Sequence, residues 1–202
     1  MIGGFSGEYK AVEFWSSAHP EQGSCVLNDY PRRMKEGPTV NLVSGRLVAC
    51  YWDSCKIYRE GSWEHLQDTT VYRTYHSSAT REDAVLLIGG TNSNFTEWIP
   101  VDGSPSKPGP FTLTRHRFSH CTIQLSDEII VTGGRNTEAF VTKYHLDSGT
   151  ETHLTPLGKP RLDHACGVYQ DADDQQVSEI LGEKKPLNKD TNRQIHKYKG
   201  HS

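Results

Sequence analysis

The sequence predicts an all-β protein built from repeated units of four short strands. An Arg-x-x-His motif begins at Arg73, Arg117 and Arg161, so its copies are 44 residues apart. An apolar run that ends in Gly-Gly recurs with the same 44-residue step, at residues 89–90 and 133–134. Turn residues separate these short runs, as is typical of antiparallel sheets. Because two independent motifs share one period, we interpret the chain as a repeat protein.

The composition is that of a folded chain without a membrane span. Hydrophobic residues make up 34% of the 202 residues, and no run of about 18 apolar residues occurs. Four Trp, nine Tyr and six Phe exclude gross disorder, and the net charge of −3 predicts no basic face. We therefore expect neither membrane insertion nor a nucleic-acid partner. The residues that follow Met1 do not resemble a signal peptide.

The chain begins inside a unit. Ile2-Gly3-Gly4 has the form of the end of a second strand, so residues 1–30 are a partial unit. The next unit, residues 37–69, has Cys50 and Tyr51 in the places of the glycine pair. Its expected strands are 39–43, 47–51, 55–59 and 63–67.

Two further complete units and a final strand follow. Residues 84–88 and 128–132 are unbroken apolar runs, which indicates second strands buried on both faces. Residues 161–170 are the first strand of a further unit, and the polar residues 171–202 are expected to be a disordered tail. The expected strands of unit 72–114 are 72–79, 84–88, 95–101 and 110–114, and those of unit 116–155 are 118–125, 128–132, 141–146 and 151–154.

Four short strands in about 40–50 residues are typical of one blade of a β-propeller. Aromatic residues stand in the third strands, at Tyr58, Trp98 and Tyr144, and Trp63 follows Gly61-Ser62 in a fourth strand. With the glycine pairs and the Arg-x-x-His motif, residues 1–170 resemble kelch repeats. The resemblance implies a kelch-type β-propeller with about three full four-stranded blades and partial blades at both ends. We interpret the chain as a fragment whose open flanks could self-associate, with a closed four-bladed ring as the alternative.

The resemblance implies a non-catalytic scaffold that presents loops to a partner protein of unknown identity. Two alternatives stay open: a substrate-receptor fragment of a cullin ubiquitin ligase, and a copper enzyme similar to galactose oxidase. No catalytic signature is present, so we predict no enzyme activity, no cofactor and no metal site. The expected partner-binding residues lie in the loops after the second strands: Ser6, Glu8, Trp52, Asp53, Asn92, Asn94, Arg135 and Asn136.

The repeated glycines, arginines and histidines are expected to be structural. Equivalent positions in adjacent blades face their own neighbours and not one point, which disfavours a shared metal ion. We expect the arginines and histidines to hold the junctions between blades. The repeat positions are Gly3, Gly4, Gly89, Gly90, Gly133, Gly134, Arg73, His76, Arg117, His120, Arg161 and His164.

The five cysteines leave at least one thiol without a partner inside the chain. A tight hairpin at residues 51–54 would make Cys50 and Cys55 cross-strand neighbours, at a separation that suits a disulfide. Two free thiols are the alternative. Cys121 and Cys166 lie four and five residues after their repeat arginines. Because this offset places them on opposite strand faces, we expect no bond between them.

Two further features bear on the compartment. The Cys-x4-Cys hairpin, followed by Gly61-Ser62-Trp63, resembles secreted invertebrate kelch-type proteins. Asn94-Phe95-Thr96 is a glycosylation sequon in an expected loop. Both favour an extracellular protein, with the cytoplasm as the alternative.

Overall fold

The computed structural model describes residues 12–15, 24–31, 39–170, 176–181 and 197–199. Every regular element in these ranges is a β-strand, and all the paired strands are antiparallel. The prediction of an all-β protein is therefore confirmed. In the same ranges, no helix is long and apolar enough to cross a bilayer.

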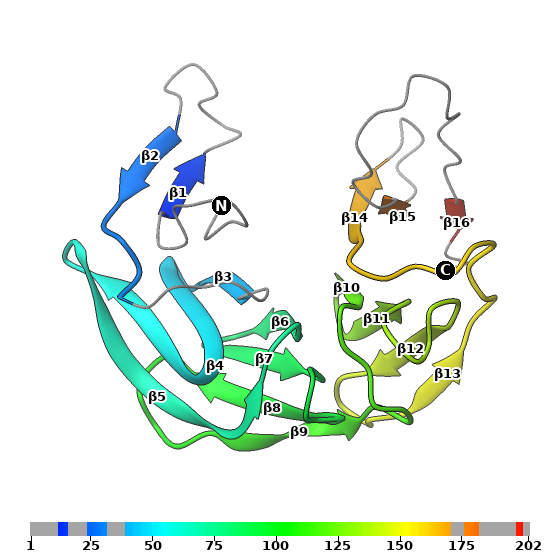
Figure 1. Cartoon of the computed structure of the whole chain (residues 1–202), viewed down its shortest axis with the longest axis horizontal. Helices are drawn as coiled ribbons and strands as arrows, with labels where there is room; N and C mark the ends of the chain where they lie inside the picture. Colours follow the sequence, from blue (N-terminus) through cyan, green and yellow to red (C-terminus); the bar gives the residue numbers. More distant parts are fainter. Residues whose placement is uncertain (1–11, 16–23, 32–38, 171–175, 182–196, 200–202) are drawn as a thin grey trace.

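The described strands form separate sheets that follow chain order (Figure 1). The first two sheets contain β1 (Val12–Trp15) and β2 (Ser24–Leu27), then β3 (Thr39–Val43), β4 (Arg46–Arg59) and β5 (Ser62–Arg73). The third contains β6 (Ser77–Arg81), β7 (Ala84–Ile88), β8 (Phe95–Pro100) and β9 (Lys107–Thr112). The last two contain β10 (Cys121–Leu125), β11 (Glu128–Thr132), β12 (Val141–His145) and β13 (Glu151–His153), then β14 (Ala165–Gln170), β15 (Gln176–Leu181) and β16 (Lys197–Lys199).

The sheets stand one after another along an arc, with the first strand of each sheet on the inner side (Figure 1). The contacts between sheets agree with this order: β3 touches β6, β6 touches β10, and β10 touches β14. Neighbouring sheets therefore stack face to face, and each of the middle sheets is covered on both sides.

This stacking explains why the second strands are continuous apolar runs. Alternate side chains of β7 point to opposite faces of the sheet. Val85 and Leu87 pack with Ile57 of β4, while Leu86 and Ile88 pack against residues of β11 and β12. These four side chains are completely buried. The expected bounds of β7 and β11, 84–88 and 128–132, match the observed strands.

The long strand β4 reverses direction near its middle. The Cα atoms of Cys50 and Cys55 lie 4.1 Å apart although the residues are five positions apart in sequence. A straight strand would separate them by about 16 Å. The residues between them thus form the tight hairpin that the sequence predicts. Pairing of Val43 with Arg46 places Tyr51 and Trp52 in the glycine positions, one residue later than expected.

The first strands begin later than predicted. β6 begins at Ser77 and β10 at Cys121, whereas starts at 72 and 118 were expected. Tyr75 and Ser119 have φ values of 53° and 55°, in the left-handed region that interrupts an extended strand. The preceding residues Tyr72 and Arg73 belong instead to the end of β5.

Residues 171–202, which we expect to be a disordered tail, include two described strands, β15 and β16. β15 pairs with β14, and β16 pairs with β15. An unpaired β14 edge would expose backbone donors and acceptors, and a following extended segment satisfies them even when its side chains are polar. The other residues of the tail, like most of the partial unit 1–30, lie outside the described residues.

Candidate functional site

The Arg-x-x-His segments and the Gly-Gly turns of successive sheets lie against each other. The Gly90 amide donates to the Arg117 carbonyl at 3.0 Å, and 44 residues later the Gly134 amide donates to the Arg161 carbonyl at 2.8 Å. A second pair of bonds links the segments themselves, from Ser119 N–H to the Tyr75 carbonyl (2.9 Å) and from Asp163 N–H to the Ser119 carbonyl (3.0 Å). The sequence repeat is thus a repeated hydrogen-bond network across the junctions.

The junction leaves no room for side chains at the glycine pairs. Gly89 and Gly133 have φ values of 61° and 59°. A Cβ on Gly89 would lie 2.8 Å from the Arg117 carbonyl oxygen, and one on Gly133 would lie 2.5 Å from that of Arg161. Both the backbone conformation and the approach of the next segment therefore require glycine. Gly3 and Gly4 lie outside the described residues.

Each repeat histidine binds a hydroxyl group of the preceding sheet. Nε2 of His76 lies 3.1 Å from Thr39 Oγ1, and Nε2 of His120 lies 2.7 Å from Ser77 Oγ. Thr39 and Ser77 are the first residues of β3 and β6. His164 instead binds the last residue of a second strand: its Nε2 lies 2.9 Å from Oγ1 of Thr132 in β11. Burial, and after it the charge of the neighbouring repeat arginine, lowers the pKa of His76 and of His120 to about 3 and that of His164 to about 4. These imidazoles are neutral groups that link sheets.

Arg73 and Arg117 bind backbone and side-chain oxygens of the sheet that follows each of them in the chain. Arg73 Nη1 donates to the carbonyls of Gly89 and Phe95 at 3.3 and 3.2 Å, and its Nη2 forms a 3.0 Å ion pair with Glu97. Arg117 donates to the Val131 carbonyl at 3.1 Å. Arg161 joins the network through its carbonyl. In the described part of the chain, no group of three or more His, Cys, Asp or Glu side chains could hold a metal ion.

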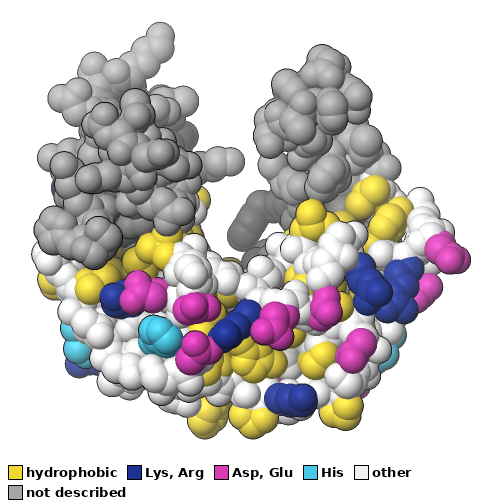
Figure 2. Space-filling model, turned by 180° about the vertical axis from the view of Figure 1, so that it is seen from behind, with side chains coloured by type: hydrophobic (Ala, Val, Ile, Leu, Met, Phe, Trp, Pro, Cys, Tyr) yellow, Lys and Arg dark blue, Asp and Glu magenta, His cyan; other side chains and the backbone are white. Residues whose placement is uncertain are grey.

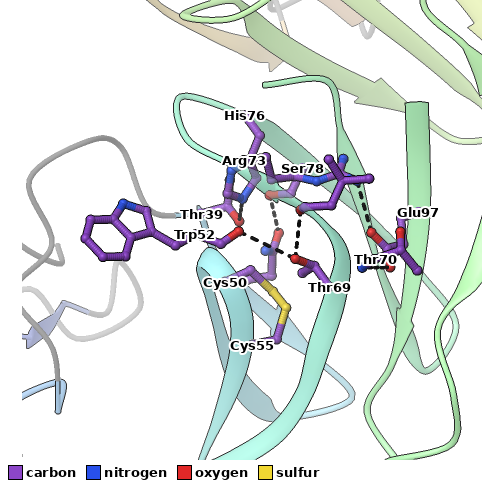
Figure 3. The surroundings of a disulfide bond; sticks show 12 residues. Thr39, Cys50, Trp52, Cys55, Thr69, Thr70, Arg73, His76, Ser78 and Glu97 are labelled. Carbon is purple, nitrogen blue, oxygen red and sulfur yellow. Dashed lines mark hydrogen bonds and ion pairs between the residues drawn. A yellow bond between two sulfur atoms is a disulfide. The ribbon is translucent and has the colours of Figure 1, made fainter. Parts of the chain in front are cut away.

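The hairpin cysteines form a disulfide at the inner end of the second sheet. The Cys50 and Cys55 sulfurs are 2.06 Å apart, and both residues are completely buried. Figure 3 shows the bond beside the Thr39, Arg73 and His76 side chains, with the Trp52 ring pointing away from it. The second sheet, which lacks the glycine pair, is thus cross-linked by a disulfide.

The expectation for Cys121 and Cys166 is wrong, because they form a second disulfide with an S–S distance of 2.05 Å. The offset from the repeat arginines disfavours a bond only between strands of one sheet. The strands β10 and β14 belong to neighbouring sheets that stack face to face. In such a stack, the front of one sheet meets the back of the next, so opposite faces are those that touch.

The expected loop residues have different surroundings in the described part of the chain. Ser6 and Glu8 lie outside the described residues. Trp52 is half-buried against Tyr51 and Tyr72, with ring centroids 5.1 and 5.7 Å away. Asp53 and Asn92 are exposed on separate loops.

Asn94, the acceptor residue of the sequon, is half-buried. Its side-chain amide donates to the Leu113 carbonyl at 3.3 Å, and the Thr96 hydroxyl of the same sequon is bound to the Phe111 carbonyl. Glycosylation at Asn94 stays a prediction.

Arg135 and Asn136 belong to a contiguous surface that we name the Phe118 patch. The Arg135 guanidinium carbon lies 5.6 Å from the centre of the Phe118 ring. The Tyr75 and His116 rings lie 6.3 and 6.1 Å from the same ring, and Asn136 Nδ2 donates to the His116 carbonyl at 3.5 Å. The patch consists of Tyr75, His116, Phe118, Arg135 and Asn136.

Backbone pairing holds the Phe118 patch in place. Phe118 and Arg135 form an isolated antiparallel bridge, with a 2.8 Å bond from Arg135 N–H to the Phe118 carbonyl. The sequence analysis missed Phe118, His116 and Tyr75 as surface residues. The available signal was their position inside or next to Arg-x-x-His motifs, which we had assigned to the junctions alone.

The opposite ends of the strands have a different character. There the turns carry charged side chains paired across sheets, as in the Arg81–Asp147 ion pair (2.6 Å) and the bond from the Ser44 hydroxyl to Asp83. Figure 2 shows a face on which acidic and basic side chains alternate over the sheets. Alternating charges satisfy one another locally, whereas the Phe118 patch offers rings and an exposed guanidinium.

Comparison with known proteins supports the fold and no more. No family model matches the chain, and no curated protein matches it. Among solved structures, one titled "Structure of YjhT" is similar, with a TM-score of 0.65 and 11% sequence identity. The match covers 80% of this chain and 64% of that chain, so this chain spans under two thirds of its length. At this identity the likeness shows a shared all-β arrangement alone.

Proposed function

We propose that the chain is part of a kelch-type β-propeller that binds a partner protein through the Phe118 patch. The arc of face-to-face antiparallel sheets and the junction network with its 44-residue step support the propeller. Experimental coordinates in which the sheets are not arranged around an axis would contradict this part of the proposal.

The Phe118 patch is the observation that carries the binding role. Tyr, Phe and Arg are enriched where protein interfaces gain most of their energy, because rings bury area with little loss of side-chain entropy. Arg135 lies over the Phe118 ring, so the guanidinium is held in place before a partner arrives. Loops held by a rigid scaffold of sheets are common recognition sites.

The two disulfides favour an oxidising compartment. We place the protein's action outside the cell on this ground, which the hairpin resemblance of the sequence also favours. The copper-enzyme and ligase-receptor alternatives depend on the resemblance alone, and no observed contact adds to them.

The test is capture by the 202-residue chain from an extracellular protein fraction, compared with two variants. Arg135→Glu reverses the charge over the Phe118 ring, while Lys107→Glu makes the same reversal at an exposed position of β9. We expect a partner that native protein and Lys107→Glu capture equally and Arg135→Glu captures at least about tenfold less, a difference of about 1.4 kcal/mol. Equal capture by all three proteins, or no capture by any, would contradict the proposal.

A further inference from the structure

Two equivalent buried arginines have different partners. Arg73 is fully buried, and its charge meets Glu97, whose side chain is 3% exposed. Glu97 also accepts a 2.8 Å bond from the Thr70 amide. This is the arrangement expected of a buried cation, because an uncompensated charge in the interior is costly.

Arg117, 44 residues later, lacks the carboxylate. The register pairs Leu87 with Glu97 and Val131 with Thr142, so Thr142 occupies the place of Glu97. Arg117 is 3% exposed, and among the described residues its guanidinium donates to two neutral groups, the Val131 carbonyl and, at 3.4 Å, the Thr142 hydroxyl. The Nε atoms of Arg73 and Arg117 both have no hydrogen-bond partner in the described part of the chain. Arg117 differs in that, within the same limits, it forms no ion pair.

A small cavity lies beside this guanidinium. Its volume is about 20 Å³, and its lining includes Arg117, Thr142 and Tyr144. A cavity needs about 10–15 Å³ of such space to hold one water molecule, so this one suits a single water or a monatomic ion. The shorter threonine leaves space where the third sheet has a carboxylate.

The other charged groups at the cavity give a net positive surrounding. Arg115 also lines it, as do Glu151 and His153. Glu151 opposes an anion, and its charge acts to raise the pKa of Arg117 against the lowering by burial. One of its carboxylate oxygens accepts a bond from the Thr114 hydroxyl, and the other lies 3.6 Å from His153 Nε2 without a hydrogen-bond partner among the described residues. Two permanent guanidinium charges therefore face a single carboxylate.

We propose that this cavity binds one halide ion, chloride in physiological media, which compensates the buried Arg117 charge as Glu97 compensates Arg73. The inference stands apart from the proposed partner binding, because it concerns the interior between the third and fourth sheets and not the Phe118 patch. A ligand that binds only the folded state raises its stability in proportion to the logarithm of the ligand concentration, once the site is half full.

The first test measures the melting temperature of the full chain while chloride replaces gluconate at constant ionic strength. We expect the melting temperature of native protein to rise with chloride. Thr142→Glu supplies a carboxylate at the site and should abolish the rise, whereas Thr112→Glu, the same change at an exposed position of β9, should keep it. Equal chloride responses in native protein and Thr142→Glu would overturn the proposal.

The second test does not depend on a variant that folds. Crystals of native protein grown in bromide should show an anomalous difference peak next to Arg117. Density for a water molecule at that position, without anomalous signal, would overturn the proposal whatever the melting curves show.

Discussion

Two junctions of the arc use the same pair of positions in different ways. Between the third and fourth sheets, the hydroxyl groups of Ser77 and Thr122 are hydrogen-bonded. Between the fourth and fifth sheets, the equivalent residues Cys121 and Cys166 form a disulfide. Both pairs stand four and five residues after their repeat arginines. The same two positions can therefore be linked by a hydrogen bond or by a disulfide, and the disulfide joins the fourth sheet to the fifth.

The comparison also explains the different partner of His164. His120 binds Ser77, which occupies the first position of β6. At the next junction that position is Cys121, whose sulfur is already bonded. His164 binds Thr132 instead, the residue paired across the sheet with Cys121. Exchange of one side chain therefore changes a second contact without disturbing the repeat.

Removal of the junction disulfide should have the largest effect. We expect Cys121→Ser with Cys166→Ser to lower the free energy of unfolding by about 2–4 kcal/mol, because the bond closes a long loop in the unfolded chain. Urea titration measures the loss, and amide exchange should show faster exchange in β14. A double variant as stable as native protein would mean that the bond does not hold the final sheet.

A side chain at the junction glycine should lower the free energy of unfolding by a somewhat smaller amount. Gly133→Ala forces a Cβ against the Arg161 carbonyl at a φ of 59°, and we expect a loss of about 2–3 kcal/mol. Gly103→Ala is the matched control, because Gly103 also has positive φ but has no atom within 4 Å of the added Cβ. Similar losses in thermal melts would show that φ, and not the neighbouring sheet, dictates the glycine.

The weaker junction should accept the stronger link. We expect Ser77→Cys with Thr122→Cys to form a disulfide and to raise the free energy of unfolding by about 2 kcal/mol under oxidising conditions. Thiol counting and urea titration with and without reductant measure the two effects. Thiols that stay free would contradict the equivalence of the two junctions.

Lowering the pH should weaken the histidine contacts, and the loss of stability for each pH unit should be smaller than the changes predicted above. The pKa of His120 is lowered to about 3, so the unfolded chain binds the extra proton first. Stability is then complete above about pH 6.5 and falls as pH drops toward 3, by about 1.4 kcal/mol per pH unit for each such histidine. His120→Gln should reduce the slope of stability against pH by the part that one titrating histidine contributes. Thermal melts from pH 7 to 5 measure this slope. Thr112→Gln, at an exposed position, should leave the slope unchanged.

The 44-residue repeat and the apolar runs were sufficient to predict the central strands. β7 and β11 have the expected bounds because a fully buried strand needs an unbroken apolar run, which ends where Gly89 or Gly133 turns the chain. The hairpin at Cys50 and Cys55 was also predictable, because it depends on local chain geometry.

The features that were missed depend on neighbours distant in sequence. Tyr75, Ser119 and Asp163 share φ values of 53°, 55° and 51°, and none of them is a glycine, so nothing local marked the delayed strand starts. The Cys121–Cys166 bond depends on how sheets stack, and alternation along a strand says nothing of that. β15 and β16 pair through backbone groups, which a polar composition does not reveal.

The two disulfides also imply an order of events during biosynthesis. Cys50 and Cys55 are five positions apart, so their hairpin needs only local chain closure and can be oxidised before the sheets stack. Cys121 and Cys166 are 45 positions apart, and they meet only when β10 and β14 are already stacked. Oxidation of the second pair therefore reports that the sheet containing β14 has docked on the sheet containing β10.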